Sequence, residues 1–554
     1  MADGRQPQSA EKDSIATAAI VPPEPPPSTK KPLSFYMSLL AIGLSALLTS
    51  WDATSLSIAL PVITSDLQGT TLESFWASVA FILGVAITQP IYVNVSDVLG
   101  RKQPLYASMV LFAVGSVVFA TARNMSVLIA GRLIQGLGAG GLDVLEEIIL
   151  ADITNLKERP MYIGLLAVAV AAGTISGPIL GAVFSEFVDW RWIGWINLPV
   201  VGLAFVLALF FLHLRPIPLR FSAKVRRLDW IGMGLFAVGA AATTLPLSWA
   251  NALYPWSSWR TIVPFVIGLV VLAIFCFYEK RVANSVLTNG IPPNGVLPYR
   301  IFANVTSVSS LITGFIHGLI LYTTLLYSPL FYEAVFLEAP LEAAKSTLPI
   351  CTLVVAFSFV APVIIEITRR YRVLLWVGWI LTTVFLGLWC LVGQATSRAE
   401  AYVFQCLLGA GAGILFTGIQ VPMQASVVDV NDTGLAVGML VVFRLFGGLV
   451  GLSISSTAFS SVFQHSIAAL GTLPEQVQVL NDASQAVGFI PTLRTLDLPS
   501  EFMSKLVEAY RQPFQVIWII MTCFSGVGFF VSLFTKELSL ENEDVGRQGF
   551  ERPL

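Results

Sequence analysis

Charged side chains inside long apolar segments are the first candidates for chemistry in this sequence. Six such residues occur, and they are Asp52, Arg132, Asp143, Glu146, Glu147 and Arg444. A charge at the centre of a bilayer costs about 2.5–3.5 kcal/mol on insertion scales, so it is retained where it faces a partner or a water-filled cavity. We therefore expect these residues to face the inside of a helix bundle, where acids can carry protons.

Three of the acids share one face of the fourth apolar segment. At about 100° per residue, Glu146 lies about 60° to one side of Asp143 and Glu147 lies about 40° to the other. Arg132 lies about three turns earlier and only about 20° from the same line. Burial and neighbouring carboxylates favour the protonated acid, which suits a group that loads and releases protons near neutral pH. Glu147 and Asp143 are the leading proton carriers, followed by Asp52; a buried structural ion-pair network is the alternative.

The loop between the second and third apolar segments carries a short charged turn. It contains Asp97, Gly100, Arg101 and Lys102. The glycine favours a tight turn, and Asp152, at the end of the fourth segment on the same side of the membrane, is a plausible partner for Arg101. We expect these residues to form a latch between helices that can open and close. The alternative is that these charges only set the orientation of the chain in the membrane.

Other polar residues give weaker signals. Four of them could line a substrate cavity, and they are Gln135, His317, Tyr322 and Gln420. The five cysteines and three histidines are scattered, without a CxxC pair or a metal-ligand spacing. No Walker A sequence and no nucleophile–base spacing occurs, so we expect no metal, no cofactor and no enzyme activity.

Glycines predict close helix packing. The run 136–141 satisfies GxGxxG, but a dinucleotide site needs a preceding strand, and this run lies inside a long apolar segment where small residues let helices approach. The fifth segment carries Gly173, Gly177, Pro178 and Gly181, which predict a kinked helix with close neighbours.

The composition indicates a membrane protein. Hydrophobic residues make up 55% of the 554 residues and charged residues 12%, about half the roughly 25% of a soluble protein. The net charge of -2 excludes a strongly basic nucleic-acid binder. The apolar runs predict an all-α polytopic fold with fourteen spans, near 35–60, 74–95, 104–122, 126–150, 162–186, 192–213, 229–249, 261–278, 304–327, 345–365, 373–393, 401–421, 434–461 and 514–535.

The distribution of basic residues and two internal sequence similarities indicate how these spans are arranged. Most Lys and Arg fall in one set of loops, so the positive-inside rule predicts that both termini are cytoplasmic. The charged turn is echoed at 366–370, and the glycines at 136–140 are echoed at 409–413, which indicates two related six-helix halves. The predicted parts are a disordered tail (1–33), a six-helix bundle (34–214), a linker with two additional spans (215–302), a second six-helix bundle (303–535) with an extracellular loop (462–513), and a cytoplasmic tail (536–554).

Four motifs resemble those of the major facilitator superfamily, and most closely its fourteen-span drug:proton antiporter branch in fungi. They are Asp52-x-Thr54-x4-Ala59-Leu60-Pro61, Ser96-Asp97-x2-Gly100-Arg101-Lys102, Arg132-x2-Gln135-Gly136-x-Gly138-x-Gly140-Gly141 and Gly173-x3-Gly177-Pro178-x2-Gly181. The match departs from the family at Val93 and Ala182, where the motifs usually carry glycine. The resemblance implies that Arg132 steers proton transfer, that Asp97 with Arg101 gates alternating access, and that the segment 173–181 closes the cavity against leak.

The resemblance implies a monomeric, proton-coupled antiporter that exports hydrophobic small molecules such as drugs, toxins or secondary metabolites. We expect it in the plasma membrane, with the vacuolar membrane as the alternative. Two other functions stay open at this point. One is a proton-coupled importer on the same fold, for example of iron-siderophore complexes, and the other is a membrane receptor that transports nothing.

Overall fold

The structure is a computed structural model that describes residues 31–67, 71–155, 158–215, 228–250, 254–289, 301–302, 304–427, 432–482 and 486–540. These residues form helices joined by short connections, and no β-strand element occurs among them. Thirteen of the described helices are long and apolar enough to cross a membrane by length and composition. The predicted all-α membrane fold is therefore confirmed. Most of the predicted tails and parts of the predicted linker (216–227 and 290–300) lie outside the described residues.

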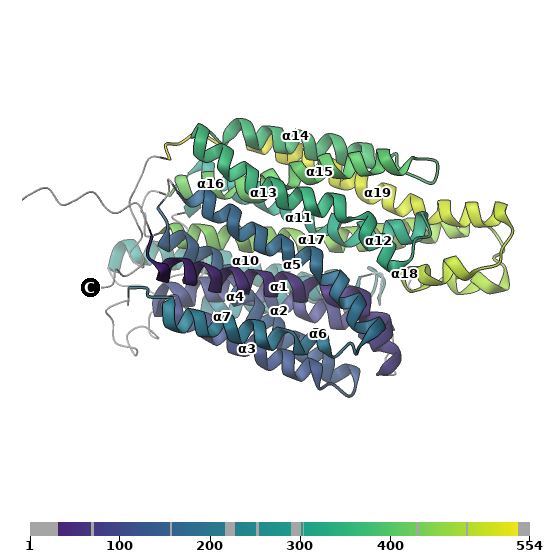
Figure 1. The fold of residues 1–554 in the computed structure, drawn as a ribbon, viewed down its shortest axis with the longest axis horizontal. Coiled ribbons are helices and arrows are strands. Elements are labelled where there is room, and N and C mark those ends of the chain that lie inside the picture. The colour runs from purple at the N-terminus through teal and green to yellow at the C-terminus, as the bar shows by residue number, and fades with distance from the viewer. Residues whose placement is uncertain are drawn as a thin grey trace, which may run out of the picture.

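Two groups of helices make up the body of the molecule (Figure 1). The first group, the N bundle, contains α1 (Leu33–Asp66), α2 (Thr71–Leu99), α3 (Lys102–Ala120), α4 (Met125–Ile153), α5 (Arg159–Phe187), α6 (Trp192–Trp195) and α7 (Asn197–Phe211). The second group, the C bundle, contains α11 (Val305–Val335), α12 (Pro340–Ser346), α13 (Leu348–Thr368), α14 (Arg372–Trp389), α15 (Arg398–Gly418), α16 (Gln420–Ala425), α17 (Thr433–Ala468) and α19 (Ser500–Ser532). The pairs α6–α7, α12–α13 and α15–α16 each form one span.

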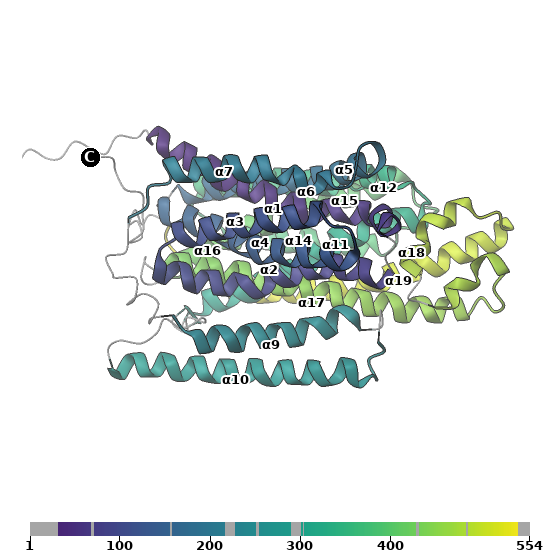
Figure 2. The ribbon, with the colours of Figure 1, turned by 90° about the horizontal axis from the view of Figure 1, so that it is seen from below.

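The inserted pair consists of α9 (Trp230–Trp249) and α10 (Trp259–Asn289). Figure 2 shows the two helices side by side along one flank of the bundles, where α9 contacts α2 and α17. The apolar part of α9, Trp230–Pro246, is shorter than the roughly 20 residues that a span needs. Among the described residues there are therefore thirteen helices long enough to span a membrane and one shorter apolar helix, and the count of fourteen spans stays a prediction.

Glycines bring α4 into backbone contact with two neighbours. A Cβ atom on Gly136 would meet the carbonyl of Phe81 on α2, and one on Gly138 would meet the backbone of Phe112 on α3. No larger residue fits at these two positions without moving a helix. The glycine run is therefore a packing surface inside α4, as its place in an apolar segment predicts.

The same plan recurs in the C bundle. A Cβ atom on Gly409 of α15 would meet the backbone of Ile350 on α13, and one on Gly411 would meet Thr382 on α14. The two glycine runs thus pack a central helix against two neighbours in the same order along the chain. This agreement in three dimensions supports the internal repeat that the sequence indicates.

The predicted loop 462–513 is largely helical. Helix α17 continues to Ala468 and α19 begins at Ser500, because apolar side chains keep helical spacing there and pack on each other, as Phe463 and Tyr510 do with ring centroids 4.7 Å apart. The connection between them contains η3 (Glu475–Asn481), α18 (Ala486–Phe489) and η5 (Ile490–Thr495). These residues extend beyond the other helices at one end of the molecule, at the right of Figure 1.

The opposite end of the bundles carries Arg101 and is called here the Arg101 end. Both ends of the described chain lie there: Lys31 pairs with Glu158 at 2.5 Å, and the backbone nitrogen of Lys536 donates to Thr306 Oγ1 at 3.2 Å. Which side of the membrane this end faces stays a prediction.

Candidate functional site

The six predicted intramembrane charges divide into two separate groups. Asp52 and Arg132 form one group within the N bundle, where Arg132 Nη1 donates to Asp52 Oδ2 at 2.5 Å. The acids of α4 form the second group with Arg444 of α17, at the boundary between the two bundles. One helix, α4, therefore carries charges into both groups.

Hydrogen bonds from neighbouring helices enclose the Asp52–Arg132 pair. Asn197 Nδ2 donates to Asp52 Oδ1 at 2.9 Å, and Gln135 Nε2 donates to the same oxygen at 3.3 Å and to Ser116 Oγ at 2.9 Å. All of these side chains are buried. We call Asp52, Ser116, Arg132, Gln135 and Asn197 the Asp52 network. It joins α1, α3, α4 and α7, and every member belongs to the N bundle.

The second group contains more acid than base. Asp143, Glu146 and Glu147 lie on α4, and Arg444 of the C bundle is the cation near Asp143 and Glu147. Asp143 accepts a hydrogen bond from Gln89 of α2, whereas Glu146 Oε2 is buried without a hydrogen-bond partner among the described residues. Burying a charged carboxylate without a partner is costly, so this group is built to hold fewer negative charges than it has acids.

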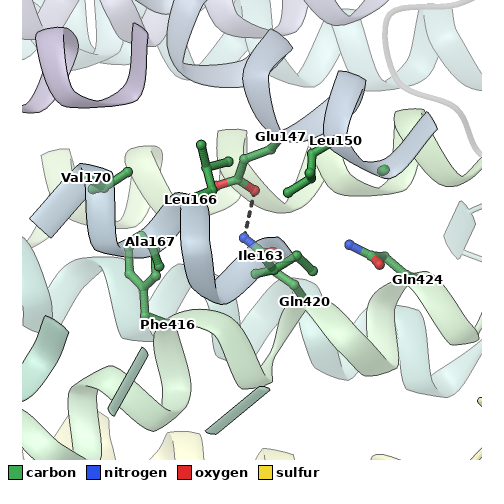
Figure 3. A pocket seen from close by; sticks show the side chains of 10 residues that line it. Glu147, Leu150, Ile163, Leu166, Ala167, Val170, Phe416, Gln420 and Gln424 are labelled. Atoms are coloured by element: carbon green, nitrogen blue, oxygen red, sulfur yellow. Dashed lines mark hydrogen bonds between the residues drawn. The ribbon is translucent and has the colours of Figure 1, made fainter. Parts of the chain in front are cut away.

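Glu147 reaches across the boundary between the bundles (Figure 3). Its Oε2 atom accepts a hydrogen bond from Gln420 Nε2 of α16 at 2.7 Å, and its Oε1 atom lies 3.8 Å from Arg444 Nη1. Both partners belong to the C bundle. A change in the charge of Glu147 therefore acts directly on the contact between the two halves.

A small pocket opens beside Glu147 between α4 and α5 on one side and α15 and α16 on the other (Figure 3). It is lined by Glu147, Leu150, Ala151, Ile163, Leu166, Ala167, Val170, Phe416, Gln420 and Gln424. The space has room for about one water molecule. A drug-sized ligand would therefore need the bundles to move apart at this level.

The four candidate cavity residues do not lie together. Gln420 lines the pocket, and Tyr322 of α11 lies near the charges of Asp143 and Arg444. Gln135 belongs to the Asp52 network. His317 contacts the carbonyl of Ala412 on α15 through Nε2 at 3.0 Å and does not line the pocket.

The charged turn forms a buried cluster at the Arg101 end. Arg101 Nε donates to Asp152 Oδ2 at 2.8 Å, and Arg101 Nη2 lies 3.7 Å from Asp97 Oδ1. Burial alone would lower the pKa of Arg101, but Asp152 and Asp97 outweigh it and raise the pKa, so the guanidinium stays charged. Gly100 has φ of 99°, a conformation that favours glycine, and Lys102 begins α3.

This cluster also touches the C bundle. A Cβ atom on Gly434 of α17 would lie 2.7 Å from Arg101 Nη2 and 3.2 Å from Asp152 Oδ1. The predicted pair of Arg101 with Asp152 is thus present in the structure, and it lies where the first turn of α17 meets the end of α4. No motif or spacing in the sequence predicts Gly434 at this position.

Arg159 is a site residue that the sequence analysis missed. It is the first residue of α5, and its Nη2 atom donates to the carbonyls of Ala151 and Thr154 at 2.8 Å each, while Nη1 donates to Gln424 Oε1 of α16 at 3.2 Å. Burial lowers its pKa to about 10. An arginine directly before Pro160 at the start of a predicted span was the available signal, since a cation there can satisfy the last carbonyls of the preceding helix.

The fifth-segment glycines pack α5 against α1. A Cβ atom on Gly173 would meet the carbonyl of Leu47, and one on Gly181 would meet the carbonyl of Ser55. Gly177 lies between them and faces Thr54. The predicted close neighbour is therefore α1 of the same bundle, and Pro178 lies inside the continuous helix α5.

Comparison with known proteins agrees with this architecture. A sequence model described as Major Facilitator Superfamily matches residues 42–231. The MFS-type transporter sphD of Aspergillus fumigatus is 44% identical over 525 residues, which cover 94% of this chain and 89% of that protein. The MFS-type efflux pump LUC4 of a Fusarium species is 31% identical over 545 residues, which cover 98% of this chain and 94% of that protein.

A solved structure shows the same fold. The human organic anion transporter MFSD10 superposes with a TM-score of 0.57 at 14% identity, covering 91% of this chain and 100% of that one. At this identity the likeness concerns the fold alone. Members of the matched family are transporters and not enzymes, in agreement with the absence of a nucleophile–base spacing in the sequence. The chain is a multi-pass membrane transporter that belongs to the Major Facilitator Superfamily.

Proposed function

We propose that this protein is a proton-driven antiporter that exports hydrophobic small molecules, with secondary metabolites as the leading substrate class. The observation that carries the proposal is the excess of acids on α4 at the bundle boundary, with Glu147 in the wall of a pocket that lies between the bundles. Glu147 is a buried acid of the N bundle that contacts the C bundle. Such an acid can exchange a proton, and its surroundings change when the two bundles move. Export is supported by relatives that carry efflux in their names, among them LUC4.

In the proposed cycle, the two bundles rock about the pocket and expose it to one side at a time. Protonation neutralises Glu147 or Asp143 and lowers the cost of burying the group in a closed state. Substrate leaves in exchange for this proton. The largely apolar lining of the pocket, with two amides and one acid, supports a hydrophobic substrate with a few polar groups. We further propose that the protein works as a monomer in the plasma membrane with cytoplasmic termini.

The test is flux in liposomes that contain the purified full-length protein and an imposed pH gradient. A panel of hydrophobic compounds is screened, and we expect uptake or release of at least one compound that collapses with a protonophore. Glu147→Gln and Asp143→Asn are expected to abolish this gradient-driven flux. Glu342→Gln is the control, because Glu342 forms an exposed pair with Lys345 on α12 at 2.7 Å and is expected to leave flux unchanged.

Two outcomes would contradict the proposal. Flux that survives in both α4 variants and in the presence of protonophore would show that these acids do not couple transport to protons. The second outcome concerns growth of cells that express the protein. If these cells become more sensitive to the transported compounds and resistant to none of them, the protein imports the compounds instead of exporting them.

A further inference from the structure

Arg444 is the cation that the C bundle presents to the acids of α4, and its surroundings fix it on that bundle. Its Nη2 atom donates to the carbonyl of Phe416 on α15 at 2.8 Å, and its guanidinium carbon lies 4.4 Å from the centroid of the Phe416 ring. The side chain is buried, with 4% exposure. Arg444 therefore moves with the C bundle, while Glu147 moves with the N bundle.

The two contacts that Glu147 makes with the C bundle differ in their dependence on charge. Gln420 donates a hydrogen bond from a neutral amide at 2.7 Å, and a protonated carboxyl group can still accept it through its carbonyl oxygen. Arg444 lies 3.8 Å away, beyond hydrogen-bond distance, so its attraction is Coulombic. Uptake of a proton by Glu147 would thus remove the Arg444 contact selectively.

The Arg444–Glu147 pair lies where α17 and α4 approach the middle of the molecule. Helices α17 and α4 run antiparallel from the Arg101 end toward the middle of the molecule: Gly434 lies beside Asp152, Gly438 lies beside Ile148, and Arg444 faces Glu147. The contact of Arg444 with Glu147 therefore lies at the inner end of a continuous line of contact between the bundles.

Other titratable groups face the same place. Asp143 and Glu146 lie on α4 next to Glu147, and Tyr322 and His317 of α11 lie near Arg444. Among the residues that line the adjoining pocket from α5, α15 and α16, none is charged. Arg444 is thus the cation whose attraction depends on the protonation of these acids.

We propose that Arg444 is a positioning residue that ties the C bundle to ionised Glu147 and releases the N bundle when Glu147 takes up a proton. Its use in a transport cycle rests on the proton-coupled export proposed above. The contact between Arg444 and ionised Glu147, called here the tie, exists in the protein without bound substrate. It can therefore be tested in the absence of substrate.

The experiment measures the separation of the bundles at the Arg101 end. Spin labels are introduced through an encoded unnatural amino acid at Gln103, exposed at the start of α3, and at Ile367, 78% exposed near the end of α13. Distances between the labels are measured by pulsed electron paramagnetic resonance on the full-length protein in liposomes, at alkaline and at acidic pH. We expect wild type to shift toward larger separation at acidic pH.

Four variants and one control variant separate the tie from a general effect on folding. Arg444→Gln and Glu147→Gln are each expected to show the separated population at both pH values, and Arg444→Lys is expected to restore the wild-type response. The exchange Glu147→Arg with Arg444→Glu is expected to restore the close population at alkaline pH. Arg398→Gln, which removes a pair with Glu338 inside the C bundle at 3.1 Å, is expected to behave as wild type.

A full wild-type response to pH in Glu147→Gln would overturn the proposal, even if Arg444→Gln failed to fold. Failure of the charge exchange to restore the close population would overturn it as well. A protein that shows the expected separation but drives no compound along a pH gradient would retain the tie and refute the export function, so the two proposals fail separately.

Discussion

At the scale of single residues, the buried charges differ in which partners they have. Asp52 and Arg132 neutralise each other, and the Asp52 network gives the carboxylate two further hydrogen bonds from Gln135 and Asn197. The acids of α4 outnumber the cation that faces them, and Glu146 keeps an oxygen without a partner among the described residues. The paired charges of the Asp52 network hold one bundle together, whereas the group with more acids than cations lies where the bundles meet.

The first prediction concerns the Asp52 network. Asp52→Asn is expected to lower the free energy of unfolding by about 3–5 kcal/mol, because Arg132 would stay buried without its counter-charge. In the double variant Asp52→Asn with Arg132→Gln, the loss is expected to be smaller than in Asp52→Asn alone. Chemical unfolding in detergent micelles, followed by tryptophan fluorescence, measures both. A double variant that loses as much as the sum of the single variants would contradict the coupling.

At the scale of elements, the two related loops are stabilised by different parts of the chain. In the N bundle, Arg101 pairs with Asp152 at the end of α4. In the C bundle, the residues after α19 take this place: the carboxylate of Glu537 accepts from the backbone nitrogens of Tyr371 at 2.9 Å and Arg372 at 3.3 Å. The echo at 366–370 therefore comprises the end of α13 and the start of the short connection to α14, and the C-terminal segment caps α14.

This cap leads to the second prediction. Glu537→Ala is expected to lower the free energy of unfolding by about 0.5–2 kcal/mol, because the first backbone nitrogens of α14 would lose their acceptor. The measurement is the unfolding midpoint in detergent micelles. Glu501→Gln at the start of α19 is the control, since Glu501 forms an exposed pair with Lys505 at 2.8 Å and is expected to leave the midpoint unchanged. Equal midpoints for the Glu537 variant and wild type would refute the cap.

At the scale of the whole molecule, the bundles meet mainly where α17 contacts α4 and α2 and where α5 contacts α13. The pocket between them is smaller than any drug-sized ligand. A ligand of that size could pass between the bundles only if these helices separated. The small residues along α17 set how closely α17 approaches α4 and α2. A Cβ atom on Gly438 would lie 2.6 Å from Val93 and 3.0 Å from Ile148, so the contact at this level leaves no free space.

The third prediction tests this close approach. Gly438→Leu is expected to push α17 away from α2 and α4, which would enlarge the distance between the labels at Gln103 and Ile367 at both pH values. Folding is expected to persist, because the side chain enters the boundary between the bundles and not the core of either. Gly526→Leu on α19 is the control, since a Cβ atom there meets nothing within 4 Å. An unchanged distance in Gly438→Leu would contradict the role of this contact.

The sequence by itself determined the membrane class and the helical fold, and it predicted the repeat and the six intramembrane charges, because hydropathy and the 3.6-residue period are local properties of the chain. It also indicated the pairing of Arg101 with Asp152. Only the tertiary structure decided that Asp52 and Arg132 neutralise each other within one bundle while Glu147 faces Arg444 across the boundary, and that Arg159 and Glu537 cap helix ends. These contacts join residues far apart in the chain, so their partners depend on how the helices pack, and no spacing along the sequence records that packing.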